Sequence, residues 1–211
     1  MADGPARVER MALCDLFLAV GPDAPTLSGS WSTRDLAAHL VVRERRPDAA
    51  IGIVTTFLAN HGERVRLEEA ERPYPEIVER VRRGPPIWSP THVGAIDTLA
   101  NSIEFFVHHE DVRRAGPVWD VRSLSTDLED ALAGMVERGG RLLARRCPVG
   151  IAVDADGRQE MRLRSGTTSV TIRGPIGECV LYLNGRKDVA QVALEGPDDA
   201  LAAVAAAPFG I

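Results

Sequence analysis

The most informative stretch of the sequence is EFFVHHED at residues 104–111, whose spacing is that of a helix with a polar stripe beside an apolar face. Each residue advances about 100° around a helix axis, so Glu104, His108 and Asp111 fall on one stripe while His109 points roughly the other way. The apolar residues of the surrounding segment gather on the adjoining face: Ile96, Leu99, Ile103 and Val107. This periodicity predicts a long helix whose polar stripe borders the protein core.

A glutamate and a histidine four residues apart on one helix face have two interpretations. Glu104 and His108 can ligate one metal ion together, or they can form a solvated pair on the helix surface, which the spacing alone favours. The apolar neighbours place the stripe at the border of the core, where an uncompensated Glu104 is costly to bury. Another group in the fold must therefore compensate this carboxylate.

His39 is the second histidine that the pattern directs inward. It lies in the same half of its predicted helix as Leu36 and Leu40, and by itself this pattern favours a core histidine with a hydrogen-bond partner. Two histidines and one carboxylate on inward faces suit a divalent cation, and zinc accepts both ligand types. Three ligands, His39, Glu104 and His108, leave a coordination position open for water or substrate, as catalytic sites do.

Two acidic residues near these ligands are candidates for supporting roles. Asp35 and Asp111 are predicted to accept hydrogen bonds from the ligating imidazoles and so to orient them. Asp35 also has a purely structural interpretation, because Ser32-Thr33-Arg34-Asp35 fits a loose capping box at the start of a helix.

The first two thirds of the chain have the pattern of helices, and the last third has that of a small mixed unit. Helices are predicted at residues 5–19, 32–47, 48–66, 74–83, 93–115 and 125–146. Strands are predicted at 149–153, 161–164, 170–173 and 192–194, with one helix that has Pro175 as its first residue and another from Pro197 to Ala206. The predicted class is mainly α with α+β: a helical domain over residues 1–147 and a small α+β domain over residues 148–211.

Composition excludes several classes of protein. The 211 residues are 45% hydrophobic and 26% charged, values typical of soluble globular proteins and not of disordered tails or collagen-like fibres. The net charge of −5 argues against a nucleic-acid partner, and the apolar stretch near the N-terminus is too short and too broken for a membrane span. Cys14, Cys147 and Cys179 form no Cys-x-x-Cys pair, which favours reduced thiols and a cytoplasmic location.

Four segments together resemble a known family. WSTRDLAAHL at residues 31–40 and the spaced motif Glu104-x-x-x-His108-x-x-Asp111 resemble the two signature segments of the mycothiol-dependent maleylpyruvate isomerase family. VTIRGP at 170–175 and LYLNGR at 181–186 resemble the small C-terminal domain of that family, so the resemblance covers nearly the whole chain. The second signature segment looks most like a subgroup of uncharacterised metal-binding proteins within the family rather than the isomerase itself.

The resemblance implies a fold and a chemistry. The implied fold is a DinB-like four-helix bundle followed by a sterol-carrier-like α+β domain, with His39, Glu104 and His108 as the metal ligands. The implied activity is that of an isomerase or transferase in which zinc, or another divalent metal, and mycothiol act on a small electrophilic substrate. An arginine of the C-terminal domain assists in the family, and Arg186 is the nearest match here. A cation at that position also simply suits the end of a helix.

The implied partners are a small-molecule substrate and a low-molecular-weight thiol, with no nucleic acid and no membrane, and a homodimer stays open. Lys187 is the only lysine among 25 Lys+Arg, a bias typical of GC-rich coding, which fits a host that uses mycothiol.

Two other functions remain open from the residues. One is a non-catalytic metal-binding protein whose C-terminal unit holds an apolar ligand, and the other is a hydrolase that uses a metal-bound hydroxide with Glu110 or Asp111 as base. A fourth protein ligand, from His92 or Asp35, would close the site and favour a structural metal.

Overall fold

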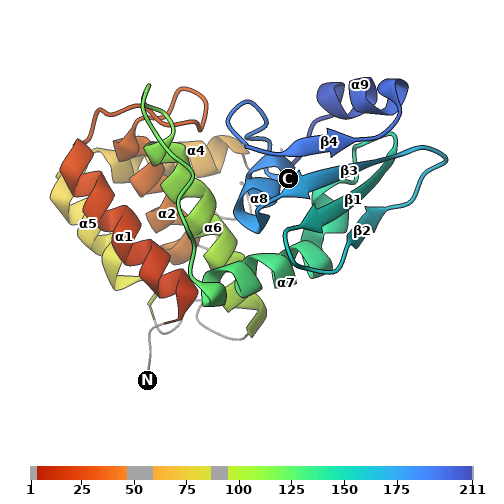
Figure 1. Ribbon diagram of the computed structural model, residues 1–211. Helices are drawn as coiled ribbons and strands as arrows, with labels where there is room; N and C mark the ends of the chain where they lie inside the picture. The colour runs from red at the N-terminus through yellow and green to blue at the C-terminus, as the bar shows by residue number, and fades with distance from the viewer. Residues whose placement is uncertain (1–3, 47–58, 87–94, 211) are drawn as a thin grey trace. The chain divides into compact units, whose positions relative to one another are not determined.

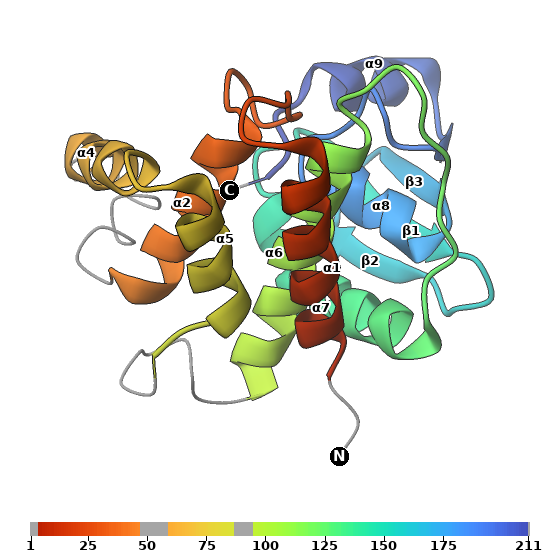
Figure 2. The ribbon, with the colours of Figure 1, turned by 90° about the vertical axis from the view of Figure 1, so that its left-hand side faces the viewer.

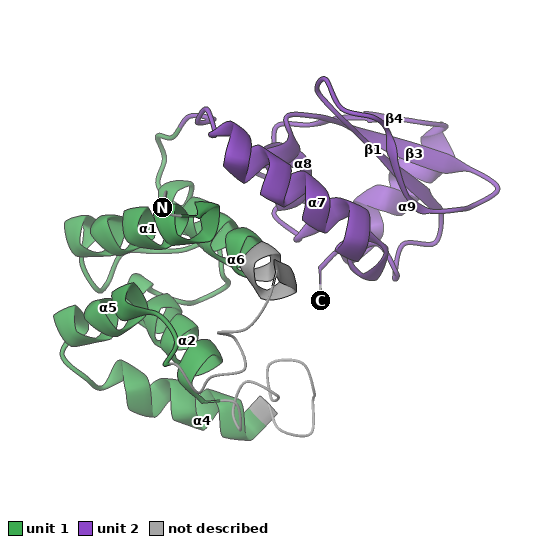
Figure 3. Ribbon diagram, turned by 90° about the horizontal axis from the view of Figure 1, so that it is seen from below, with its two compact units in different colours: residues 1–119 green, residues 120–211 purple. Residues whose placement is uncertain are grey.

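The computed structural model describes residues 4–46, 59–86 and 95–210. The chain divides into two compact units, residues 1–119 and 120–211 (Figures 1 and 3). Across the described residues it is rich in α-helix and contains a small mixed sheet, which confirms the α+β class that the sequence predicts.

The described part of the first unit is helical. Its helices are α1 (Pro5–Val20), α2 (Thr33–Arg45), α4 (Ala59–Ala70), α5 (Tyr74–Arg83) and α6 (Ala95–Arg113). Helix α1 packs against α5 and α6, and α2 packs against α4 and α5 (Figure 2). The core contains large apolar side chains that are fully buried: Leu13, Phe17, Leu36, Leu40, Ile77 and Phe105. The apolar periodicity that predicts the helices therefore also supplies the core.

The predicted helix at residues 48–66 falls mostly outside the described residues. The part that the structure describes, α4, starts at Ala59 and continues to Ala70, beyond the predicted end. Predicted helix ends elsewhere agree more closely, and 74–83 coincides with α5.

Helix α2 begins at the predicted capping box. The Ser32 hydroxyl accepts a hydrogen bond from the backbone N–H of Asp35 at 3.4 Å, and the Asp35 carboxylate accepts one from the backbone N–H of Ser32 at 3.0 Å. These reciprocal bonds satisfy donors that the first turn of a helix leaves unpaired. They set the start of α2 at Thr33, and hence the face on which His39 lies.

The second unit is a helix-covered sheet. It contains α7 (Thr126–Leu143), β1 (Gly150–Ala155), β2 (Met161–Arg164), β3 (Ser169–Gly174), α8 (Ile176–Leu183), β4 (Ala193–Glu195) and α9 (Asp198–Ala206). The strand order is β2-β1-β3-β4, in which β1 and β3 are parallel and the two outer pairings are antiparallel. Helix α8 packs on β1 and β3, over fully buried β-branched side chains: Ile151, Val153, Val170 and Ile172.

Helix α7 packs with the second unit, whereas the predicted domain boundary after residue 147 placed it with the first. The compact units divide between Trp119 and Asp120, because α7 contacts β2 and α8. The helix lies close to the sheet at Gly140, where an added Cβ would come within 2.6 Å of Leu163 Cδ2. That residues 1–147 form a separate metal-binding domain stays a prediction.

None of the helices in the described ranges is both long and apolar enough to span a membrane.

Candidate metal centre

Three predicted ligands come together between α2 and α6: His39 of α2 lies beside Glu104 and His108, which are four residues apart on α6. His39 Nε2 lies 3.4 Å from Glu104 Oε1, and His108 Nε2 lies 3.3 Å from the same oxygen. The three ligand atoms lie within 4.8 Å of one another. Both imidazole side chains are 12% exposed and Glu104 is 23% exposed, so the group borders solvent without being immersed in it. The stripe on α6 thus meets the inward face of α2.

The spacing of these atoms suits a metal ion. Zinc binds imidazole nitrogen and carboxylate oxygen at about 2.0–2.2 Å, so neighbouring ligands in a tetrahedral site lie roughly 3.3–3.5 Å apart. The separations of 3.4 Å and 3.3 Å around Glu104 Oε1 fall in that range. Among the described residues, no other histidine, cysteine or acidic side chain lies close enough to these three atoms to be a fourth ligand. His92, the alternative ligand, lies outside the described residues.

Asp111 contacts His108, one of the three candidate ligands. Its Oδ2 lies 2.9 Å from His108 Nδ1 and also accepts a hydrogen bond from the Ser28 hydroxyl at 2.8 Å. The backbone N–H of Leu27 donates to the Asp111 carbonyl at 3.0 Å, and the Asp111 side chain is fully buried. When Nδ1 carries the proton that Asp111 accepts, Nε2 of His108 is left with its lone pair toward Glu104.

Asp35 makes other contacts. Its carboxylate accepts hydrogen bonds from Ser32 and from Arg66 of α4. Its hydrogen bonds within the described residues include none to an imidazole. The contacts of Asp35 therefore match its role in the capping box. No direct contact among the described residues supports the prediction that Asp35 orients an imidazole.

Arg43 and Asn101 were missed by the sequence reasoning. Arg43 lies one turn after His39 on α2, with its Nε 3.3 Å from Glu104 Oε1 and its Nη1 donating to Asn101 Oδ1 at 2.8 Å. Asn101 is buried and lies one turn before Glu104 on α6. Their spacing could have indicated this contact, since residues one turn apart share a helix face. The same spacing is also typical of an ordinary surface arginine, so Arg43 was not singled out.

Trp31 covers His39. The two ring centroids are 5.1 Å apart, and the guanidinium of Arg66 lies 5.0 Å from the Trp31 ring centroid on the indole face. Asp35 and Glu63 both pair with Arg66, so this cation is held in place above the indole. The aromatic residue of the first signature segment thus forms a wall beside the candidate metal centre.

The charges of the cluster are unequal. Burial raises the pKa of Glu104, but Arg43 and the hydrogen bonds from the two imidazoles outweigh it and hold that pKa well below its usual value. Burial lowers the pKa of His39 below its usual value. Burial acts in the same direction on His108, but its bonds to Asp111 and Glu104 prevail and raise the His108 pKa to about 9. At neutral pH the metal-free cluster therefore holds an anionic Glu104, a neutral His39 and a protonated His108.

Glu110 and His109, which lie beside His108 in the sequence, pair with charged residues outside the cluster. Glu110, a candidate base, is fully buried and pairs with Arg113 and Arg114. His109 points away from the cluster, as predicted, and its Nδ1 lies 3.0 Å from Glu9 Oε2 of α1. These contacts account for both side chains without a role in metal binding.

The cysteines are buried and unpaired. Burial raises the pKa of Cys14 and of Cys179 to about 12, so both remain protonated thiols at neutral pH and are poor nucleophiles. No cysteine of the described residues belongs to the cluster of His39, Glu104 and His108.

Arg186 follows α8 in the second unit, and its Nη1 donates to the Asn184 carbonyl at 2.7 Å. Its predicted catalytic role stays a prediction.

Comparison with known proteins gives a match in fold. No family model matches the sequence, and no curated protein matches it. The crystal structure of the mycothiol-dependent maleylpyruvate isomerase matches with a TM-score of 0.57, 16% sequence identity and coverage of 90% of both chains. A histidine-to-alanine mutant of that enzyme matches with a TM-score of 0.58, at the same identity and coverage. The resemblance inferred from the sequence is thus confirmed at the level of the fold, which by itself does not define an activity.

Proposed function

We propose that this chain is a divalent-metal enzyme that uses a low-molecular-weight thiol to isomerise, or to transfer that thiol to, a small electrophilic substrate. The observation that carries the proposal is the convergence of His39, Glu104 and His108 in a fold similar to that of a mycothiol-dependent isomerase. Zinc is the proposed metal and mycothiol the proposed thiol. The first unit would be the DinB-like bundle, the sheet unit its sterol-carrier-like partner, and the cytoplasm the location.

The residues have distinct roles in this proposal. His39, Glu104 and His108 would hold the ion, and three protein ligands are typical of zinc sites that keep a position for water or substrate. A bound metal supplies acidity, because a coordinated thiol is deprotonated and becomes nucleophilic. Asp111 orients His108, Arg43 keeps Glu104 ionised, and Trp31 shields one side of His39 from water. Arg186 is proposed to bind carboxylate groups of the substrate.

The test is an assay with the metal and the thiol varied independently. The purified protein, stripped of metal and then reloaded with zinc, is incubated with maleylpyruvate and mycothiol, with glutathione as the control thiol. A second assay follows conjugation of mycothiol to small electrophiles. Turnover that needs both zinc and mycothiol supports the proposal. A protein that binds zinc with full stoichiometry but turns over neither kind of substrate would be a non-catalytic metal-binding protein.

Zinc binding at pH 7 should release about one proton per ion, because His108 is protonated in the metal-free protein and must become neutral to bind. Because the pKa of His108 is about 9, proton release on zinc binding should occur below pH 9 and disappear above it. The apparent affinity should therefore rise with pH between 7 and 9, by about tenfold per unit. Calorimetry in two buffers of different ionisation enthalpy counts the protons, and zero release at pH 7 would contradict the assignment.

Asp111→Asn should weaken zinc binding by about 10–100-fold, the usual effect of removing an outer carboxylate from a ligating histidine. The amide keeps the shape of the side chain but weakens its hold on His108 Nδ1. Asp35→Asn is the matched control, since it makes the same chemical change where the carboxylate contacts Ser32 and Arg66. Competition with a fluorescent chelator measures both affinities, and an equal loss in the two variants would remove the special role of Asp111.

A further inference from the structure

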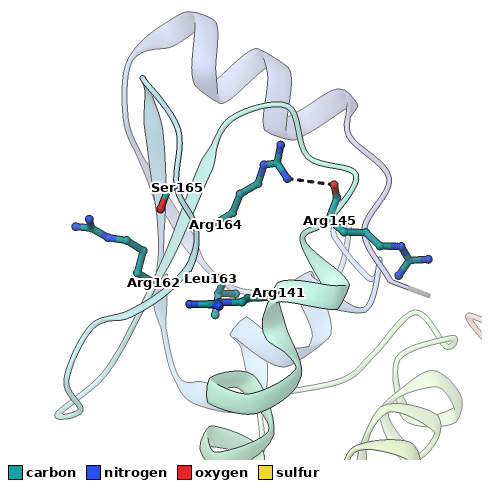
Figure 4. A pocket seen from close by; sticks show the side chains of 6 residues that line it. All are labelled: Arg141, Arg145, Arg162, Leu163, Arg164 and Ser165. Carbon is teal, nitrogen blue, oxygen red and sulfur yellow. Dashed lines mark hydrogen bonds between the residues drawn. The ribbon is translucent and has the colours of Figure 1, made fainter.

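A hollow of about 450 Å³ lies in the second unit, between the C-terminal part of α7 and strand β2 (Figure 4). Its lining, which we call the arginine pocket, is formed by six residues: Arg141, Arg145, Arg162, Leu163, Arg164 and Ser165. Guanidinium groups thus dominate the lining, and no acidic side chain belongs to it. This local charge contrasts with the net charge of −5 of the whole chain.

Local geometry gathers these cations. Arg141 lies in the last turn of α7, and Arg145 lies in the turn that follows the end of this helix at Leu143. Arg162 and Arg164 alternate with the buried Met161 and Leu163 along β2, which is an outer strand of the sheet. The close approach of α7 to Leu163 at Gly140 holds the helix and the strand together at one end of the pocket.

The four arginines lack carboxylate partners in the part of the chain that the structure describes. In the same unit, Arg158 pairs with Asp130 at 2.7 Å and Arg173 with Asp154 at 2.9 Å, so other arginines there are neutralised. Arg164 Nη1 donates to the Arg145 carbonyl at 3.3 Å. Its Nε is buried and has no acceptor among the described residues. A buried donor without an acceptor is unfavourable, and an oxyanion would supply one.

The four arginine side chains differ in exposure: Arg164 is partly buried, and the other three are exposed. Figure 4 shows Arg164 reaching from β2 toward the end of α7, while Arg145 and Arg162 extend outward on opposite sides. Arg164, whose Nε is buried, is therefore placed for the innermost contact with a ligand, and the exposed Arg141 lines the pocket nearer to solvent.

We infer that the arginine pocket binds a small polyanion with two or more oxyanion groups, either phosphoryl or carboxylate. Guanidinium groups form paired, charge-assisted hydrogen bonds with both kinds of oxyanion. The volume is in the range of small-molecule sites. Leu163 is the single apolar side chain of the lining, so the pocket suits a charged ligand better than the apolar ligand considered for this unit from the sequence.

These arginines also have purely structural uses, and the two accounts predict different results. A cation near a helix C-terminus suits the helix dipole, and charges on an outer strand prevent it from pairing with other chains. Neither use requires saturable binding of an anion, so binding is the property to measure.

The experiment titrates the full chain with pyrophosphate and with citrate by calorimetry at constant ionic strength, with acetate as the single-charge comparison. Saturable one-site binding of either polyanion is expected, and the stronger of the two identifies the ligand class. Arg164→Gln and Arg141→Gln should each weaken it by about tenfold or more. Arg138→Gln is the matched control, because it removes the same charge from an exposed position of α7 outside the lining, and it should leave the affinity unchanged.

Several outcomes would overturn the inference. One is the absence of saturable binding, and another is an equal loss of affinity in all three variants. A third is an affinity that is unchanged in all three variants, which is expected if the probes only chelate a bound metal. Binding to anionic phospholipid vesicles without binding of the soluble probes would assign the surface to a membrane instead. Thermal unfolding of each variant identifies any that fails to fold, and the other pocket variant then decides.

Discussion

His108→Ala should lower the zinc affinity of this protein by more than about 100-fold, beyond the loss expected from an outer carboxylate alone. The variant removes one of three ligand atoms that lie within 4.8 Å of one another. It also leaves Asp111 buried without its imidazole partner. His39→Ala removes the ligand from the opposite helix and should have an effect of similar size, because the ion would then be held from α6 alone.

Glu104→Gln gives the sharpest version of this test. The amide preserves the size of the side chain while removing the charge that both imidazoles and Arg43 contact. His61→Ala is the matched control, since His61 lies on α4 and does not belong to the cluster. Zinc per chain is measured by elemental analysis and affinity by chelator competition. If the variants at His39, Glu104 and His108 retain the affinity of the unsubstituted protein, the cluster is only a buried hydrogen-bond network.

Glu44→Ala should destabilise the fold by about 3–5 kcal/mol, because it leaves a buried guanidinium without its counter-charge. Arg10 of α1 pairs with Glu44 of α2 through both carboxylate oxygens, one of them at 2.8 Å, and donates to the Val81 carbonyl of α5 at 2.7 Å. Glu44 is 1% exposed. The Arg10 guanidinium also lies 4.1 Å from the Phe105 ring centroid of α6. One ion pair thus joins four helices, and urea unfolding measures its loss.

Two control variants test whether the lost stability comes from the unpaired buried charge. Glu79→Ala removes a half-exposed partner of Arg83 and should cost less than about 1 kcal/mol. The double variant Arg10→Met, Glu44→Leu removes both buried charges and should recover most of the lost stability, because well-packed apolar residues often replace a buried pair without cost. A double variant as unstable as Glu44→Ala would show that packing around Glu44, and not the unpaired charge, is responsible.

Patterns within one helix or strand were predictable from the sequence. The stripe of Glu104, His108 and Asp111 needs only the rotation per residue of a helix, and the structure places the His108–Asp111 contact where the stripe predicts it. The capping box at Ser32 and Asp35 is equally local. Alternation along 161–164 and 170–173 predicted β2 and β3 for the same reason, and β3 extends one residue further at each end.

Contacts between distant residues were harder to predict. Asp35 had two interpretations, and its pairing with Arg66 followed from the position of α4 against α2. Arg43 looked like a surface cation until the packing brought it to Glu104. Helix α7 carried an ordinary amphipathic pattern, which gives a buried face but does not say which unit covers it.

The sequence alone predicted most of the described helices and strands and their buried faces, because periodicity depends on neighbours within a turn or two. The three candidate ligands needed the family resemblance as well as this periodicity. The tertiary structure decided which atoms meet: His39 with Glu104 across 65 residues, and Arg10 with Glu44 across 34. It also brought the arginines of α7 and β2 around one hollow. Such contacts depend on how whole helices and strands pack, and packing is set by the combined burial of many side chains rather than by any single stretch of sequence.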